Sequence, residues 1–228
     1  MFRYPRTAHV FDSMGTPDDR HLSVEESYKI ISDSGLCVEE KVDGSNIGIF
    51  FEGEEDTLTL QCRGHELGSH PQYDLLKSWV QIKRSLLWGV LGTVFVLYGE
   101  WLYARHTVRY DKLPHYFLEY DIYDRGNGTF LDTDSRSMLL EGCGICSVPV
   151  LHRGPLTLEG LKGLLGPSLF STTEKAEGLY LKVERDGKSL ARAKYVRPDF
   201  IHRVATSQHW QKKPLEPNVL AKDADIWC

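Results

Sequence analysis

The sequence predicts an α+β fold in which antiparallel hairpins alternate with short helices. Two Asp-Gly pairs, Asp43-Gly44 and Asp186-Gly187, each stand between alternating apolar residues, the pattern of a strand, a tight turn and a second strand. A capping box, Ser23-Val24-Glu25-Glu26, marks the start of a helix. The chain has 228 residues, 41% hydrophobic and 26% charged, which suits one globular domain with a buried core. We therefore expect a single domain over residues 1–228.

Composition bounds the class of protein. No apolar run approaches the roughly 20 residues of a membrane-spanning helix, and the first six residues lack the apolar core of a secretory signal. Five scattered cysteines predict reduced thiols in a cytoplasmic protein. The net charge is −5, so a nucleic-acid partner would have to meet a local basic surface rather than a generally basic protein.

The first half of the chain begins with a turn-rich stretch, residues 1–22, which reads as an irregular lead-in packed on the surface. The helix that starts at Ser23 is expected to end near Gly35. Apolar positions recur with a helical period over residues 71–91, which predicts a helix packed on the core. The predicted strands of this half are residues 36–40, 47–51, 57–63 and 94–98.

The second half continues the alternation. Short helices are predicted near residues 134–141 and 157–165, and the last residues, from about 200 to 228, are expected to wrap the surface as a stub. Gly126-Asn127-Gly128 reads as a hairpin turn. The predicted strands are residues 116–124, a strand centred on Pro149, 176–184 and 189–195.

One possible metal signal is set aside. Cys143 and Cys146 have CxxC spacing, with His152 six residues later. Structural zinc needs four ligands, and the chain has no second pair at a suitable spacing. We therefore interpret Cys143 and Cys146 as a chance pair in a turn of small residues, and a structural metal site is the alternative interpretation.

Polar side chains gather at strand ends in five stretches of the sequence. Taken singly, each is more often a solvated strand terminus than a functional group. Lysine acts as a nucleophile only after losing its proton, so a reactive lysine needs nearby cations or burial to lower its pKa. The five stretches contain Lys41 with Asp43, Arg63, Glu100, Glu177, and Arg192 with Lys194.

In this order the stretches resemble the motifs of the covalent nucleotidyltransferase superfamily, and within it the stand-alone, ATP-dependent RNA ligase domains. Tyr4-Pro5-Arg6-Thr7, Tyr103-Ala104-Arg105-His106 and Ser207-Gln208-His209-Trp210 are also similar to bacterial and phage proteins of this kind. The six motifs are Glu40-Lys41-Val42-Asp43-Gly44-Ser45-Asn46, Gln61-Cys62-Arg63-Gly64, Leu97-Tyr98-Gly99-Glu100-Trp101, Phe117-Leu118-Glu119-Tyr120-Asp121-Ile122, Ala176-Glu177-Gly178-Leu179-Tyr180-Leu181-Lys182 and Arg192-Ala193-Lys194-Tyr195.

The resemblance implies a nucleotidyltransferase domain of the ATP-grasp-like ligase adenylation type, with antiparallel sheets flanking a nucleotide cleft and helices outside. Lys41 would attack the α-phosphorus of ATP, leaving a lysyl-AMP phosphoramidate. Phosphoryl transfer depends mainly on positioning and charge neutralisation. Lys194 and Arg192 would supply fixed charge and depress the pKa of Lys41 by like-charge repulsion. Glu177 completes the expected catalytic set.

The resemblance also implies a metal site and a nucleotide site. Asp43, Glu100 and Glu177 would hold a hydrated Mg²⁺ or Mn²⁺. Tyr120 would stack on the adenine, worth about 1–3 kcal/mol by analogy with base–aromatic stacking. Phosphate contacts to the strand being sealed would come from Arg63, Lys194 and Arg197, with Lys212 and Lys213 as further candidates. The expected nucleotide-binding residues are Glu40, Asn46, Arg63, Glu100, Tyr120 and Lys182.

The implied activity is the joining of RNA 5′-phosphate and 3′-hydroxyl ends, including an RNA/DNA nick as substrate. The chain departs from larger ligases because only residues 195–228 follow Lys194, too few for a C-terminal OB-fold domain. Ligation could therefore be weak or need an accessory protein that supplies the missing domain. The alternatives are a DNA nick ligase, a guanylyltransferase, a 5′-end adenylase that does not join ends, and a nucleic-acid-binding pseudoenzyme.

Overall fold

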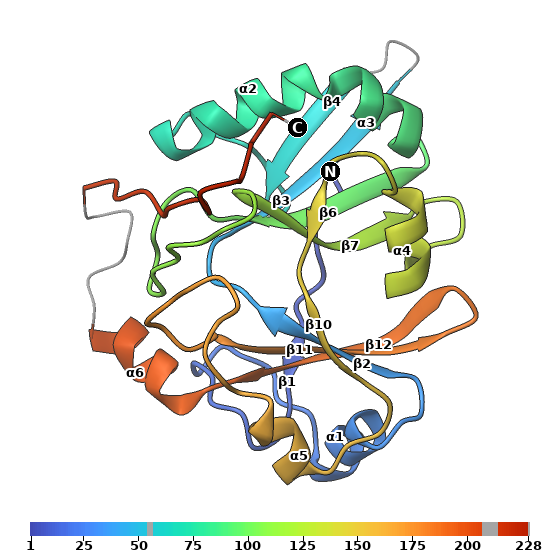
Figure 1. Cartoon of the computed structure of the whole chain (residues 1–228). Helices are drawn as coiled ribbons and strands as arrows, with labels where there is room; N and C mark the ends of the chain where they lie inside the picture. Colours follow the sequence, from blue (N-terminus) through green and yellow to red (C-terminus); the bar gives the residue numbers. More distant parts are fainter. Residues whose placement is uncertain (54–56, 207–213, 228) are drawn as a thin grey trace.

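The computed structural model describes residues 1–53, 57–206 and 214–227. Hydrogen-bonded strands follow one path in the order β10-β2-β11-β12-β8-β7-β6-β3-β4-β5, with β1 beside β12 and β9 beside β7. Figure 1 shows two strand layers, one carrying β3, β4, β6 and β7 and the other carrying β2, β11 and β12. The α+β class with an antiparallel sheet is confirmed. The two sheets expected from the sequence are joined, because β8 pairs with both β7 and β12.

Three short strands, β1, β5 and β8, were not predicted, and the predicted strands are present except around Pro149. There the chain forms two short strands, β9 (Cys146–Ser147) and β10 (Val150–Arg153), with Pro149 between them. Proline lacks the N–H that a ladder needs, which explains the interruption. The other strands are β1 (Ala8–His9), β2 (Leu36–Lys41), β3 (Ser45–Glu52), β4 (Thr57–Cys62), β5 (His65–Glu66), β6 (Phe95–Trp101), β7 (Phe117–Asp124), β8 (Thr129–Leu131), β11 (Gly178–Arg185) and β12 (Lys188–Val196).

The helices pack on the outer faces of the strand layers. The predicted capping box is confirmed at α1 (Val24–Ile31), where Ser23 Oγ accepts from Glu26 N and Glu26 accepts from Ser23 N. The single helix predicted over residues 71–91 is wrong, because the chain breaks at Lys83. The remaining helices are the 3₁₀ turn η1 (Pro71–Tyr73), α2 (Asp74–Ile82), α3 (Arg84–Leu91), α4 (Thr133–Leu139), α5 (Leu158–Gly163) and α6 (Pro198–Thr206).

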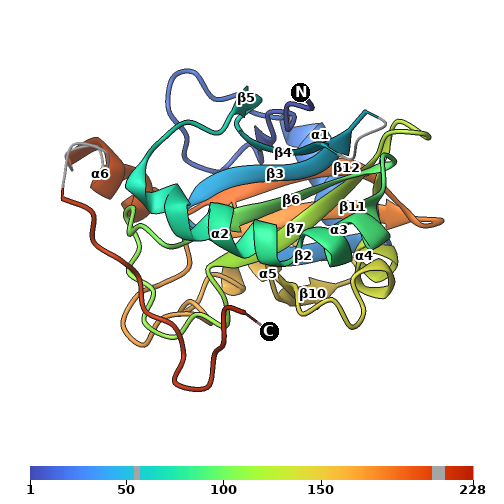
Figure 2. The same cartoon turned by 90° about the horizontal axis from the view of Figure 1, so that it is seen from above.

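Separate apolar cores lie under the two groups of helices. Seen from above, α2 and α3 lie across β3, β6 and β7 (Figure 2). The core beneath them includes Trp79, Leu87 and Phe117, each almost completely buried. The second core, which includes Ile31 and Leu181, lies beneath α1 and α5. Each group of helices therefore buries an apolar face of its own strand layer. A further apolar cluster of Phe50, Val96, Tyr98 and Phe130 packs against Phe2, Tyr4 and Tyr120.

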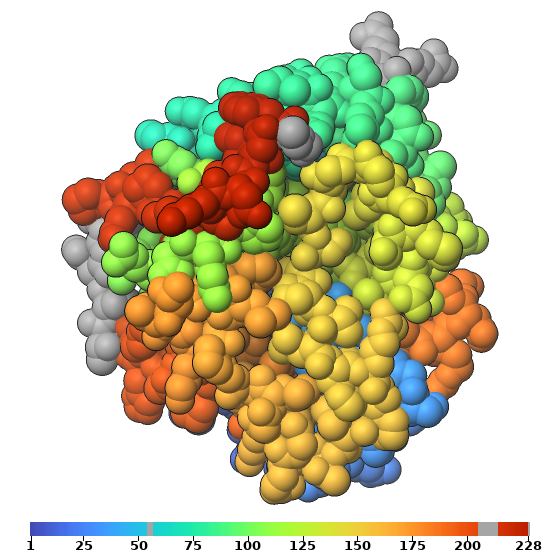
Figure 3. Space-filling model, in the orientation of Figure 1, coloured from blue at the N-terminus to red at the C-terminus, as the bar shows by residue number. Residues whose placement is uncertain are grey.

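The C-terminal stretch behaves as the sequence predicted. Residues 214–227 run along the surface, as Figure 3 shows. They add backbone contacts to the loop that follows β6, including Asn218 N to Tyr103 O and Val219 N to Tyr110 O. Asn218 is buried, and its side chain accepts from Tyr110 N and donates to Leu102 O. The stretch therefore fixes the loop that contacts Asp43, as described below.

The first residues are not the irregular surface lead-in that the sequence suggested. Ala8 and His9 form β1 and pair in parallel with Ala193 and Lys194 of β12. Residues from this stretch also enter the space between the two strand layers. Within the described residues, no helix is long and apolar enough to cross a membrane.

Candidate active site

Lys41 stands at the end of β2, and its amine is held by a carboxylate from the neighbouring strand. The β2–β11 register pairs Lys41 with Gly178, which brings the preceding Glu177 beside it. Lys41 Nζ donates to Glu177 Oε2 at 2.7 Å, and the two side chains are 26% and 8% exposed. Gly44 is required in the turn, since a Cβ there would lie 2.6 Å from Trp101 O. Lys41 is thus fixed at a tight strand end.

Carboxylates outnumber cations around Lys41. Burial raises the pKa of Glu100 to about 8 and that of Glu177 to about 7, although the charge of Lys41 opposes both shifts. Burial by itself would lower the pKa of Lys41, but Glu177 and Glu100 outweigh it and raise that pKa. The expected depression of the Lys41 pKa is therefore wrong for the ligand-free protein, because the nearest charges are negative.

Asp43 has a different task from the one predicted. Its Oδ2 accepts from the backbone N–H groups of Thr107 and Val108 at 2.7 and 2.9 Å, so the carboxylate fixes the loop after β6. Among the described residues, no group of three or more His, Cys, Asp or Glu side chains is placed to hold a metal ion directly. The three predicted carboxylates all influence Lys41 electrostatically, but they do not form a ready-made ligand set.

Lys194 lies across the cavity from Arg63 and is held by an acid from the N-terminal part of the chain. Lys194 Nζ donates to Asp19 Oδ1 at 3.3 Å. Thr16 fixes the other oxygen of Asp19 with its N–H and its hydroxyl, both at 2.9 Å. Burial and the charge of Lys41 lower the pKa of Lys194. Lys194 therefore lies close enough to Lys41 for the charge of Lys41 to affect its pKa.

Two tyrosines also line the site. Tyr120 on β7 and Tyr180 on β11 lie on different strand layers, with ring centroids 6.3 Å apart and planes tilted by 47°. Asn46 on β3 donates its side-chain amide to the hydroxyl of Tyr120. Aromatic rings stack on a flat base at van der Waals distance, but these two rings are too close and too strongly tilted to enclose one between them. Tyr120 and Asn46 are thus together, and Tyr180 is a further aromatic that the sequence reasoning missed.

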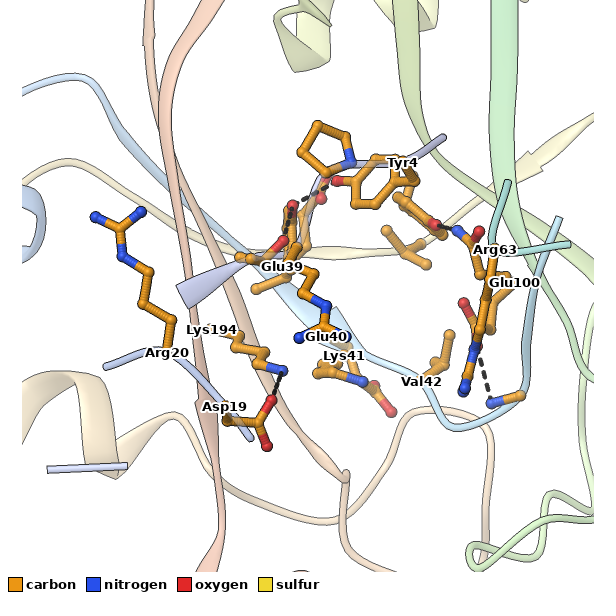
Figure 4. Close-up of a pocket in the computed structure, with 18 of the residues that line it drawn as sticks. Tyr4, Asp19, Arg20, Glu39, Glu40, Lys41, Val42, Arg63, Glu100 and Lys194 are labelled. Carbon is orange, nitrogen blue, oxygen red and sulfur yellow. Dashed lines mark hydrogen bonds and ion pairs between the residues drawn. The ribbon is translucent and has the colours of Figure 1, made fainter. Parts of the chain in front are cut away.

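One cavity of about 660 Å³ lies between the strand layers, a usual size for a small-molecule site. Of the predicted carboxylates Glu100 lines it, whereas Asp43 and Glu177 are not among its lining residues. In Figure 4, Asp19, Arg20 and Lys194 lie on one side of Lys41, while Arg63 and Glu100 lie on the other. The predicted residues that line the cavity are Glu40, Lys41, Asn46, Arg63, Glu100, Tyr120 and Lys194.

Two of these residues have distinctive environments. Arg63 is exposed and has a φ of 50°, in the left-handed region of backbone conformation. Residues other than glycine rarely adopt this conformation, and those that do are often at functional sites. Glu40 is 2% exposed, and its carboxylate accepts from Ser168 Oγ at 2.5 Å and Leu169 N at 3.0 Å. Arg63 is thus available to a ligand, whereas the Glu40 carboxylate is occupied by the protein.

Lys182 and Arg192 do not lie where the sequence predicted. Lys182 is completely buried and binds Glu39 at 2.7 Å and Asp121 at 3.0 Å. Arg192 approaches Asp121 at 3.5 Å and stacks over Phe130 at 3.6 Å. Neither lines the cavity. Both side chains face the interior, where their charges are already paired with carboxylates of the protein.

Other phosphate-contact candidates also differ. Arg197 is 5% exposed and donates to Ala176 O and Asp199, so it is a structural residue. Ser207, His209, Trp210, Lys212 and Lys213 lie outside the described residues.

Reasoning from the sequence missed most of what the N-terminal part contributes. These side chains have no helical or strand periodicity, and the only signal was the Tyr4-Pro5-Arg6-Thr7 likeness. The cavity-lining residues of this part include Arg3, Tyr4, Arg6, Thr7, Asp19 and Arg20.

Solved structures share this fold. Two lysine-to-alanine variants of the Naegleria gruberi RNA ligase, each with ATP and Mn, match with TM-scores of 0.57 and 0.60 at 20% and 18% identity. The alignments cover 77% and 90% of this chain, and 54% and 63% of theirs. The same ligase with PPi matches with a TM-score of 0.59 at 19% identity, over 90% of this chain and 63% of that one. This chain therefore spans between half and two thirds of their length.

No curated protein matches the chain in sequence. The family model described as RNA ligase matches residues 35–196, from the strand before Lys41 to the end of β12. Because this match covers 162 of the 228 residues, the chain belongs to the RNA ligase family.

Proposed function

We propose that this protein is an ATP-dependent RNA ligase whose nucleotidyltransferase domain carries AMP on Lys41. The observation that carries the proposal is the position of Lys41, held by Glu177, in one cavity with Lys194, Glu100 and Tyr120. A nucleotide would place its base against Tyr120 and its α-phosphate beside the lysines. Family membership and the shared fold of the Naegleria gruberi RNA ligase structures support this proposal.

The first chemical step would be attack of the deprotonated Lys41 amine on the α-phosphorus of ATP. An N–P bond forms, the P–O bond to pyrophosphate breaks, and one amine proton is released. Lys194 would neutralise charge on the α-phosphate, because this reaction depends chiefly on positioning and charge stabilisation. Lys194 is already fixed by Asp19, so little reorganisation is needed.

The acidic surroundings of Lys41 fit a divalent cation. Glu100 and Glu177 have raised pKa values because each is buried among other carboxylates, and a bound cation would relieve that repulsion. These two residues would hold Mg²⁺ or Mn²⁺, in part through its own waters. The ion would neutralise the carboxylates that now hold Lys41 protonated. The solved RNA ligase structures with Mn support this choice of metal.

The later steps come from the family. A 5′-phosphate oxygen of RNA would attack the phosphorus of lysyl-AMP, releasing the Lys41 amine and forming an activated 5′ end. A 3′-hydroxyl would then attack that end and release AMP. Arg63, exposed at the cavity and without an ion pair among the described residues, would meet the phosphate or ribose of the end being sealed.

The decisive experiment is incubation of the protein with α-labelled ATP, GTP or NAD. We expect label from ATP alone, in an acid-labile adduct that forms only with Mg²⁺ or Mn²⁺. Label from GTP would favour a guanylyltransferase, and absence of label from all three donors would leave only the pseudoenzyme.

A second comparison defines the acceptor. Matched nicked substrates with a 5′-phosphate and either ribose or deoxyribose at the 3′-hydroxyl nucleotide would be sealed at fixed ionic strength. We expect faster sealing with ribose, because the 2′-hydroxyl lets a site distinguish RNA from DNA. Equal sealing of the all-DNA nick would indicate a DNA ligase. Accumulation of adenylated 5′ ends without joining would point to an adenylase or to an accessory protein that completes the reaction.

A further inference from the structure

Residues 2–9, which we call the N-terminal strap, cross the space between the two strand layers and are attached to both. On one side, Phe2 N donates to Gln61 Oε1 at 2.9 Å, and the Phe2 ring packs edge-on against Phe50 with centroids 5.1 Å apart. On the other side, Thr7 Oγ1 lies 3.1 Å from the Tyr180 hydroxyl, and β1 pairs with β12. Both ends of the strap are therefore fixed.

Between these attachments Tyr4 points inward and the arginines do not. The hydroxyl of Tyr4 donates to Asp121 and is hydrogen-bonded to the hydroxyl of Tyr180. Arg3 and Arg6 are exposed, and both line the cavity. The stem of Arg3 lies against Gly64, where a Cβ would come 2.7 Å from Arg3 Cγ. Arg3 is therefore held beside the turn that carries Arg63.

The cavity arginines differ in their ion pairing from most arginines elsewhere in the described residues, although Arg109 and Arg125 also form no ion pair. In residues 1–53, 57–206 and 214–227, Arg3 and Arg6 form no ion pair, and the same holds for Arg20 and Arg63 at this cavity. A chain of net charge −5 thus places four guanidinium groups without carboxylate ion pairs around one cavity. Arginines paired with carboxylates elsewhere include Arg105, Arg136, Arg153, Arg185, Arg197 and Arg203.

Depth separates these arginines from the groups expected to hold the nucleotide. Lys41 and Lys194 are 26% and 20% exposed and lie within the cavity, beside buried acids. Arg3 and Arg6 are exposed to solvent. A mononucleotide that reaches both Lys41 and the tyrosines would occupy the inner part of the cavity. The strap arginines would then remain for a charged ligand that extends to the surface.

We propose that Arg3 and Arg6 bind phosphate groups of the 5′-phosphorylated RNA strand. This inference rests on the proposed function and adds to it a second phosphate site, on a segment outside the region that the family model matches. Guanidinium groups suit phosphate because they offer several fixed donors and a permanent charge. The pyrophosphate part of ATP has the same oxyanion chemistry, so the test must separate the two sources.

The test uses the double variant Arg3→Gln/Arg6→Gln in the full chain. Two readouts are compared: self-labelling by α-labelled ATP, and binding of a 5′-phosphorylated RNA oligonucleotide measured by fluorescence anisotropy across a salt series. We expect unchanged self-labelling and RNA affinity weakened by about tenfold or more, as for loss of charge-assisted hydrogen bonds. The slope of log affinity against log salt should decrease by about 0.7 for each phosphate that the variant no longer neutralises.

The matched control is Arg153→Gln/Arg185→Gln, which removes the same charge from side chains that are 46% and 50% exposed and lie outside the cavity lining. It should leave affinity and salt slope almost unchanged. Thermal melts establish that both double variants are folded, and Arg3→Lys/Arg6→Lys should recover part of the affinity.

Three results would overturn the inference. Equal RNA binding by the strap variant and the wild type would exclude phosphate contacts by Arg3 and Arg6. An equal loss of RNA affinity in the control variant would show that the effect comes only from the change in net charge. A loss of self-labelling with RNA binding intact would assign the arginines to the pyrophosphate part of ATP. A wild-type protein that takes no label from any nucleotide would instead contradict the proposed ligase activity, which is a separate failure.

Discussion

The ion pairs around Lys41 and those around Lys182 use the same kinds of side chain on neighbouring strands, yet they differ in exposure and in charge balance. Lys182 is 0% exposed, and its cluster contains three cations, Lys182, Arg136 and Arg192, against three carboxylates, Glu39, Glu119 and Asp121. The cluster joins β2, β11 and β12 to β7 and α4.

Lys41 has the opposite environment. It is 26% exposed, and its surroundings contain more carboxylates than cations, which is why Glu100 and Glu177 have raised pKa values. A balanced, buried cluster has no affinity left for a further ion. An accessible cluster with surplus negative charge attracts a cation, which would neutralise it. Charge balance and solvent exposure, rather than residue type, therefore distinguish the cluster around Lys41 from the cluster around Lys182.

The largest expected effect is on chemistry at the unbalanced cluster. Lys41→Ala should remove AMP labelling completely, because no other amine in the cavity occupies the strand end beside Glu177. Labelled peptide mapping and a thermal melt check this prediction. A folded Lys41→Ala protein that still carries AMP, for example on Lys194, would show that the nucleophile has been assigned to the wrong lysine.

The balanced cluster should respond in stability. Lys182→Met leaves Glu39 and Asp121 buried with one cation fewer, and loss of one partner from a buried pair costs about 3–5 kcal/mol. Urea denaturation measures the change, with Lys41→Met as the matched substitution at the exposed lysine and a smaller expected loss. If Lys182→Met kept its stability but lost ATP binding, the nucleotide-binding role predicted from the sequence would be restored.

The smallest expected effect is a pH dependence at Glu100. Its pKa is about 8 in the folded protein and 4.5 ordinarily, so the protonated form stabilises the fold below pH 4.5 and this contribution is lost as the pH rises to about 8. Glu100→Gln does not titrate. In metal-free buffer it should match the wild type at acid pH and exceed it at alkaline pH, by about 1 kcal/mol because Glu100 is partly exposed. If thermal melts of the two proteins gave the same difference in stability at acid and alkaline pH, the raised pKa of Glu100 would be contradicted.

The sequence could predict the parts of the site that depend on strand ends and turns. Lys41, Glu100, Tyr120 and Lys194 lie at the cavity because alternation fixes which face of a strand each occupies. The Asp43-Gly44 turn predicted from the sequence needs its glycine, because a Cβ at Gly44 would lie 2.6 Å from Trp101 O.

Alternation could not say how far along a face the cavity extends. Tyr180 and Lys182 share one face of β11, yet Tyr180 lines the cavity and Lys182 meets Glu39 and Asp121. Arg192 and Lys194 differ in the same way on β12. Which carboxylate pairs with a given lysine or arginine depends on the packing of strands that are distant in sequence. The role of Asp19 was invisible for the same reason, since its partner Lys194 is 175 positions away.

The pairing of β1 with β12 also sets an order of events during synthesis. Ala8 can find its partner Ala193 only after most of the chain has left the ribosome. Contacts between residues so far apart in sequence form slowly, because the loop between them must close first. The cavity that residues 2–9 help to line is therefore completed only after the strand that carries Ala193 has been made and has paired with β1.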